Sequence, residues 1–231
     1  EVPAPMCRII CKYKKTGNLK YISHLDVLRF IQRAVKRAGI NARYSEGFNP
    51  HMKTSFGFPL SLGTESMGEY FEIELNESML PQEFTERMNE VMPREIQIIK
   101  SEYTDESQSL MARCVYAQYI IGIESEKLAM DKLNDLLKEM LEPGVIYTRQ
   151  KKNKKNKYVT REINTKDYIS YLKADKNSDI KATIQAVFMT TESGSMKVGE
   201  FIRLISERAF DIDYHTIMKI DSLDKNMRAI L

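Results

Sequence analysis

The chain has 231 residues, of which 42% are hydrophobic and 29% charged, and its formal net charge is +3. This composition excludes a wholly disordered chain, and so small a charge does not by itself require a nucleic-acid partner. No apolar run approaches the roughly 18 residues that a membrane span needs, so we expect no membrane partner and a cytoplasmic location. Cys7, Cys11 and Cys114 are few and odd in number, which argues against a disulfide framework.

The first elements have clear local signals. Apolar residues alternate with basic ones from Cys7 to Tyr13, which is the period of a half-buried strand. A helix is predicted to begin at Ser23, with Asp26 as an acid in the first turn, and to end at Gly39. A connection rich in glycine, proline and aromatic residues follows at 44–60.

The rest of the chain continues with alternating strand and helix patterns, and the second half has nearly the same order of elements as the first. We predict a strand, a helix and a strand over 67–103; then, after a polar stretch at 104–109, a strand, a helix, two or three strands, a helix and a strand. A helix that joins non-adjacent strands is typical of the ferredoxin-like sandwich. The sequence therefore predicts an α+β fold of two tandem ferredoxin-like (βαββαβ) antiparallel sandwiches, at 6–105 and 110–225, the second with a basic hairpin at 149–161.

Basic residues gather in two places. Arg29, Arg33 and Arg37 recur every four residues along the first helix, with Lys36 and Arg43 near them, where they would hold phosphates or form an ordinary exposed face partly paired with acids. The 149–161 run has no acid, and it would contact RNA or be a solvated loop. Its candidate anion-binding residues are Lys151, Lys152, Lys154 and Lys155.

The 44–60 connection holds the candidate site. Asn49, His51 and Lys53 are polar groups in a loop shaped by glycine and proline, and we expect them to line one polar groove with the three arginines. His51 and Lys53 are also the candidate catalytic residues, although a lone histidine without a second base is weak support for catalysis. His24, at the start of the helix, is more readily explained as structural.

Metal and cofactor sites are not expected. The three histidines are dispersed, Cys7 and Cys11 lie on the inward face of a strand, and no cysteine cluster for an iron–sulfur centre is present in the sequence. Glycine-rich phosphate loops are absent from it as well.

Three segments together resemble a bacterial family described as radical-SAM-associated or radical-SAM-linked, a domain of unknown function: "KTGNLKYISHLDVLRFIQRAVKRAGI", "YSEGFNPHMKTSFGFPLSLGTES" and "GEYFEIEL". The resemblance implies a radical SAM enzyme on a separate chain as partner. A fainter similarity in layout is to the ferredoxin-like RNA-processing endonucleases of CRISPR systems. The positions that match the family pattern are Ser23, His24, Asp26, Arg33, Arg37, Gly39, Ser45, Gly47, Phe48, Asn49, Pro50, His51, Lys53, Ser55, Gly63, Glu65, Ser66 and Glu69.

Three functional hypotheses follow. The leading one is an RNA-binding or substrate-presenting accessory protein that acts with a radical SAM enzyme. The second is a metal-free RNA endonuclease with His51 as general acid or base and Lys53 as electrostatic stabiliser. The third is a protein adaptor that docks through Phe48, Phe56 and Phe58, unless these rings simply close the core.

Overall fold

The computed structural model describes residues 7–152, 158–191 and 194–231. The fold is mixed α+β, with mostly antiparallel strands and helices packed on them. The chain divides into two compact units, unit 1 with Glu1–Val115 and Met218–Leu231, and unit 2 with Tyr116–Ile217.

Unit 1 is built on four antiparallel strands in the order β4-β1-β3-β2. They are β1 (Cys7–Lys15), β2 (Thr54–Phe56), β3 (Glu65–Leu75) and β4 (Ile96–Tyr103). The second half of β11 (Tyr214–Leu223) runs parallel to β3, with Met218 opposite Glu65. Predicted strands at both ends of the first half are therefore confirmed.

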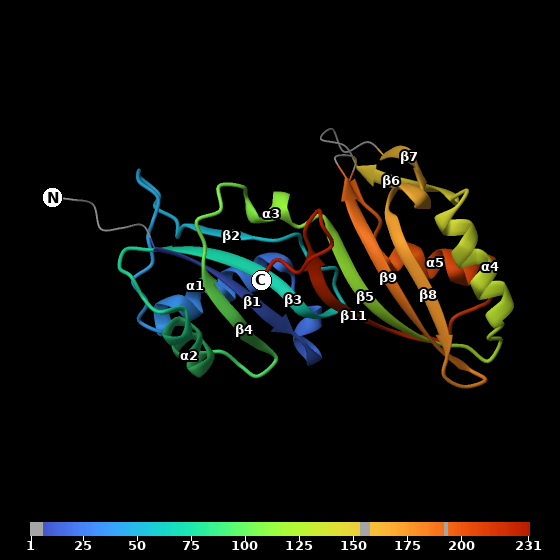
Figure 1. Cartoon of the computed structure of the whole chain (residues 1–231), viewed down its shortest axis with the longest axis horizontal. Helices are drawn as coiled ribbons and strands as arrows, with labels where there is room; N and C mark the ends of the chain where they lie inside the picture. The colour runs from blue at the N-terminus through green and yellow to red at the C-terminus, as the bar shows by residue number, and fades with distance from the viewer. Residues whose placement is uncertain (1–6, 153–157, 192–193) are drawn as a thin grey trace. The chain divides into compact units, whose positions relative to one another are not determined.

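Two helices cover one face of this sheet, α1 (His24–Arg37) and α2 (Pro81–Val91) (Figure 1). The predicted signals at the ends of α1 are present: the Ser23 hydroxyl accepts a hydrogen bond from the Asp26 N–H at 3.2 Å, and Gly39 has a φ of +64°. Three short elements of unit 1 were not located from the sequence: a 3-10 helix at Gly17–Tyr21, β2 within the 44–60 connection, and α3 (Leu110–Arg113).

The two faces of the unit 1 sheet have different cores. Alternate residues of β1 and β3, among them Cys11 and Phe71, pack with α1 and α2 in the larger cluster. Their neighbours Ile10 and Tyr70 point the other way and pack with Leu110 of α3. Each residue of β3 can thus be assigned to the helix face or to the opposite face.

Unit 2 has β5 (Tyr116–Glu124) between β9 (Lys181–Thr191) and the first half of β11, and β9 also pairs with β8 (Ile169–Lys176) and with β10 (Gly194–Ser195). Its helices are α4 (Met130–Leu141) and α5 (Val198–Arg208). A separate hairpin joins β6 (Ile146–Lys152) to β7 (Tyr158–Asn164).

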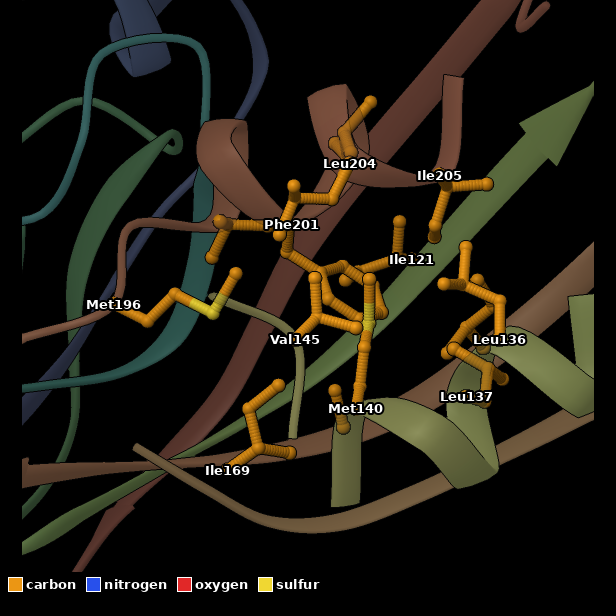
Figure 2. Close-up of a cluster of buried hydrophobic side chains, with 14 of the residues drawn as sticks. Ile121, Leu136, Leu137, Met140, Val145, Ile169, Met196, Phe201, Leu204 and Ile205 are labelled. Atoms are coloured by element: carbon orange, nitrogen blue, oxygen red, sulfur yellow. The ribbon is translucent and has the colours of Figure 1, made fainter. Parts of the chain in front are cut away.

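The core of unit 2 is closed by side chains from both helices and from the sheet. Leu136 and Met140 of α4 and Phe201 and Ile205 of α5 converge on Ile121 of β5 (Figure 2). The helical spacing of these apolar residues was readable in the sequence. The sequence pattern from Ser125 onward predicts a longer helix, but α4 begins only at Met130, because residues 125–129 include a turn in which the Ser125 hydroxyl donates to the Asp211 carbonyl at 2.6 Å.

The division of the chain is less simple than two consecutive segments. Residues 218–231 return to unit 1, because β11 continues from unit 2 into a pairing with β3.

Among the residues that the structure describes, no helix combines the length and the apolar character needed to cross a membrane.

Candidate nucleic-acid interface

The segment before β2 is a small hairpin, Tyr44–Met52, rather than an irregular loop. Tyr44 and Met52 form an isolated antiparallel bridge. The Ser45 N–H donates to the His51 carbonyl at 2.8 Å, and the His51 N–H donates to the Ser45 hydroxyl at 3.0 Å. The same hydroxyl lies 2.8 Å from His51 Nδ1. His51 is thus part of the clamp that closes the hairpin.

The five residues between the clamped ends, 46–50, are all exposed. Gly47 has a φ of +112°, which lies in a region that glycine adopts readily and other residues rarely do. Phe48 beside it has a relative exposure of 111%, so the ring has no intramolecular packing to hide it. The tip therefore presents one large apolar side chain to solvent.

The exposed face of α1 leads to this hairpin. Arg29, Arg33 and Lys36 are exposed and spaced four and three residues apart, so they share one side of the helix. Lys36 Nζ lies 5.8 Å from the centre of the Tyr44 ring at the base of the hairpin. An exposed ion pair of 3.7 Å joins Arg29 to Asp26 and neutralises the far end of the row.

Arg37 does not belong to this row. Its guanidinium donates to the Val91 carbonyl at the end of α2 at 3.1 Å and lies 5.7 Å over the Phe30 ring. The predicted stripe of Arg29, Arg33 and Arg37 is therefore split: Lys36 takes the place of Arg37 in the basic row, which we define as Arg29, Arg33 and Lys36.

A cavity of about 330 Å³ lies on the opposite face of the sheet, below the hairpin. Its polar lining residues are Arg8, His51, Lys53, Thr54, Ser55, Glu72 and Glu74. The Thr54 hydroxyl is turned to the helix side, where it accepts a hydrogen bond from Gln32 of α1 at 3.2 Å, while Lys53 and Ser55 on either side of it line the cavity. The hairpin thus lies between the basic row and the cavity.

The cavity is not a simple anion site, because acids balance its cations. Lys53 Nζ lies 3.4 Å and Arg43 Nη1 lies 3.9 Å from Glu74 Oε2. Arg8 lies 3.7 Å from the nearly buried Glu72 carboxylate. Burial raises the pKa of the Glu72 carboxyl, while Arg113 and Arg8 oppose that effect. Any ligand that uses Lys53 must compete with Glu74.

The predicted single groove is therefore not formed. His51 and Lys53 line the cavity together, and Asn49 is at the exposed hairpin tip. Arg29 and Arg33 lie on α1, on the other side of the sheet. The sequence contains no local signal for which face of the sheet Lys53 would occupy. That face depends on how β2 pairs with β3.

The loop aromatics also separate. Phe56 is in the core and stacks on Phe71 at 5.7 Å between ring centres. Phe58 packs with the small cluster of Ile10 and Tyr70 on the other face. Phe56 and Phe58 thus close the two cores of unit 1, and Phe48 alone of the three is exposed.

The basic run of unit 2 is only partly described. Lys151 and Lys152 are in β6, and Lys154 and Lys155 lie outside the described residues. Arg149, at the root of the hairpin, donates from Nε to a Glu200 carboxylate oxygen at 2.7 Å, and Tyr147 donates to the other at 2.9 Å. Arg149 is therefore engaged within the unit.

A group of buried charges was not predicted. Lys219 donates to Glu69 at 2.7 Å, and the two residues are 4% and 5% exposed. Ser66 donates to the same carboxylate oxygen at 2.8 Å. Burial lowers the pKa of nearby His24, Glu69 raises it, and Lys15 lowers it further. An acid at an inward position of β3 indicates from the sequence that Glu69 needs a buried partner. The sequence does not indicate that this partner is Lys219, 150 residues later.

His24 packs at the start of α1 with its ring 6.1 Å from Phe56, edge to face, which fits the structural interpretation of this residue. Within residues 7–152, 158–191 and 194–231, no three or more His, Cys, Asp or Glu side chains gather in a way that could hold a metal ion. All three cysteines are buried and free.

Known proteins were compared with this chain in sequence and in fold. The model of a family described as "Uncharacterized protein conserved in bacteria (DUF2344)" matches residues 8–198. No curated protein matches.

Among solved structures, a chain of a Cbf5-Nop10-Gar1 complex is similar in fold at a TM-score of 0.51 and 11% identity, over 94% of this chain and 50% of that one. This chain thus spans about half the length of that neighbour. An unknown protein from Galdieria sulphuraria matches at 10% identity and a TM-score of 0.27, over 93% of this chain and 98% of that one. A putative glycine cleavage system transcriptional repressor matches at 11% identity and a TM-score of 0.26, over 94% of this chain and 99% of that one.

Proposed function

The chain belongs to the bacterial family DUF2344, and we propose a function from its own residues: an RNA-binding accessory protein that acts with a radical SAM enzyme on a separate chain. The observation that carries the proposal is the basic row of Arg29, Arg33 and Lys36, which is exposed along α1 and ends at the Tyr44–Met52 hairpin. RNA is the ligand whose regularly spaced phosphates suit such a row.

The charges around the row support a polyanion. Arg29 has a partial partner in Asp26, but both side chains are more than half exposed, and such pairs contribute little and exchange readily. On the far side of the hairpin, Arg8 and Lys53 add two further cations. Glu72 and Glu74 balance these two cations, so a strand that crosses the hairpin would meet net positive charge at the basic row and would compete with the two acids on the other side.

Catalysis is not part of the proposal. The Ser45 contact at Nδ1 still leaves Nε2 of His51 to transfer a proton, but the candidate stabiliser Lys53 shares its charge with Glu74 at 3.4 Å. The endonuclease alternative remains testable in the same samples, because it predicts that bound RNA is cleaved and that His51→Ala abolishes cleavage while binding persists.

The radical SAM partner rests on the resemblance of three quoted segments, which include both the α1 sequence and the hairpin. A substrate-presenting role would place the RNA of unit 1 near the partner enzyme. We expect the full chain to co-purify from its native bacterium with an iron–sulfur protein, and the association to survive nuclease treatment. Recovery of RNA without any such protein would contradict the partnership alone.

We also propose that each unit is a ferredoxin-like sandwich. The order β4-β1-β3-β2 in unit 1 supports this assignment, as does the sequence of neighbours β11, β5, β9 and β8 in unit 2. The β6–β7 hairpin would then be an insertion after the first helix of the second sandwich.

The test is a salt titration of RNA binding. Fluorescence anisotropy with a labelled RNA should give an affinity that falls with salt by roughly 0.7 log unit per log unit for each phosphate contacted. Arg33→Ala and Lys36→Ala should weaken binding and lower that slope. Lys132→Ala, which removes an exposed lysine from α4 of unit 2, should leave both unchanged. Absent or salt-independent binding would overturn the proposed function.

A further inference from the structure

Phe48 is the most exposed large apolar side chain among the described residues, at 111% of the reference exposure. Exposing an aromatic ring in this way forgoes the stabilisation of about 1.5–3 kcal/mol that its burial would give. The segment could have turned the ring inward, as it does with Phe56 eight residues later. The ring is therefore placed where a ligand can cover it.

The position of the ring is fixed by its supports. The two Ser45–His51 backbone contacts and the Tyr44–Met52 bridge hold both ends of the hairpin. Pro50 restricts the residue before it to an extended conformation. A platform held in advance loses less conformational entropy on binding than a free loop would.

We infer that Phe48 is a base-stacking platform and that the RNA bound by unit 1 is single-stranded, with at least one base free to leave its neighbours. This inference rests on the proposed function, and it names the class of RNA. Phe48 is three residues from His51, at most about 11 Å along the chain. A base on the ring thus keeps its own phosphates close to the cations that flank the hairpin.

Duplex RNA does not fit this arrangement. In a duplex both faces of every base are covered by stacking, and the deep, narrow major groove of A-form RNA does not admit side chains. A protruding ring can be covered only by a base that is already unpaired or at a strand end. The same base-to-ring contact is tolerant of sequence, because every base has a flat face.

A protein partner fits the tip less well than a base does. A stable protein interface buries about 800 Å² on each side, whereas one aromatic side chain supplies about 150–250 Å². The exposed residues beside the ring are Glu46, Gly47, Asn49 and Pro50, which offer no continuous apolar patch. A single flat ring with cations nearby matches a nucleotide in both size and charge.

The experiment compares three labelled RNAs of equal length on the full chain: a single strand, a self-complementary duplex, and the single strand with abasic residues in place of bases. The single strand should bind most tightly. Phe48→Ala should weaken its binding by about 5- to 150-fold, the range expected for loss of one stacked base. The salt slope should not change, since no phosphate contact is lost.

Two substitutions separate stacking from apolar contact. Phe48→Tyr keeps a flat ring and should bind as the parent does, whereas Phe48→Leu keeps apolar bulk and should be as weak as Phe48→Ala. Tyr171→Ala removes a partly exposed ring, 44% of the reference exposure, from β8 of unit 2 and should have no effect. The abasic RNA should bind equally to the parent protein and to the Phe48→Ala variant, because it has no base to stack on either.

Failure of the inference is distinct from failure of the proposed function. If the duplex binds as tightly as the single strand, or if Phe48→Leu binds as the parent does, stacking is refuted while RNA binding stands. If none of the three RNAs binds, the proposed function falls and the inference falls with it.

Discussion

Replacing Glu74 by glutamine should strengthen RNA binding, which is the opposite of what most substitutions in a binding site do. Glu74 Oε2 lies 3.4 Å from Lys53 Nζ and 3.9 Å from Arg43 Nη1. At an effective dielectric constant of about 20, two unit charges at the shorter distance attract by roughly 5 kcal/mol before desolvation and entropy are subtracted.

The net value of this pair is much smaller. The Lys53 and Glu74 side chains are 36% and 27% exposed, so solvent screens them, and exposed pairs contribute about 0.2–1 kcal/mol in practice. RNA phosphates that recruited Lys53 would have to replace that amount. Glu74→Gln removes the competition, so we expect affinity for single-stranded RNA to rise about two- to fivefold.

The assay is fluorescence anisotropy with single-stranded RNA across a salt series. If Lys53 then contacts one more phosphate, the salt dependence should steepen by about 0.7 log unit per log unit. Glu207→Gln is the matched control, because it removes the same charge from a 3.6 Å pair with Arg203 in unit 2. Weaker binding by Glu74→Gln, or an equal gain in both variants, would refute a specific role for Glu74 beside Lys53.

Other predictions concern the stability of unit 1. Lys219→Met should lower the free energy of unfolding by about 3–5 kcal/mol in urea titrations, because it leaves the buried Glu69 carboxylate without its cation. The free energy of unfolding should fall as the pH drops through about 6.5. Burial holds the pKa of His24 below its unfolded value, so the unfolded chain binds more protons than the folded one in this range. A His24→Gln variant should lose this pH dependence. Gly68→Ala should prevent normal β3–β11 pairing, as a Cβ there would lie 2.5 Å from a backbone carbon of β11, whereas Gly199→Ala, with nothing within 4 Å, should melt at or above the parent temperature.

The elements of unit 1 could be predicted where the signal is local. Ser23 and Gly39 define the ends of α1 within a residue, because capping and the left-handed residue after a helix depend only on neighbours in sequence. Glycine and proline in the 44–60 connection indicate a loop with a defined conformation. They do not indicate that Ser45 and His51 hydrogen-bond to each other across it. That clamp needs the register of Tyr44 against Met52, for which the sequence carries no marker.

The candidate site was predicted less well because it depends on pairing between distant residues. Arg37 leaves the basic row because α2 provides the Val91 carbonyl as a partner for its guanidinium. Glu72 and Glu74 could be seen as the outward residues of an alternating strand. That they would face Arg8 and Lys53 requires the antiparallel register of β1 and β2 on β3.

Buried charge also explains why unit 1 includes residues 218–231. Glu69 is 5% exposed and takes its cation, Lys219, from β11, and Lys12 of β1 donates to Asp221 of the same strand. A fragment ending at Val115 would retain Glu69 in the sheet without this partner, and an unpaired buried carboxylate costs several kcal/mol, a large part of the stability of a small domain. Binding measured on such a fragment would therefore report misfolding rather than the hairpin, so the effects of Phe48 and Glu74 substitutions are interpretable only in a chain that keeps residues 218–223.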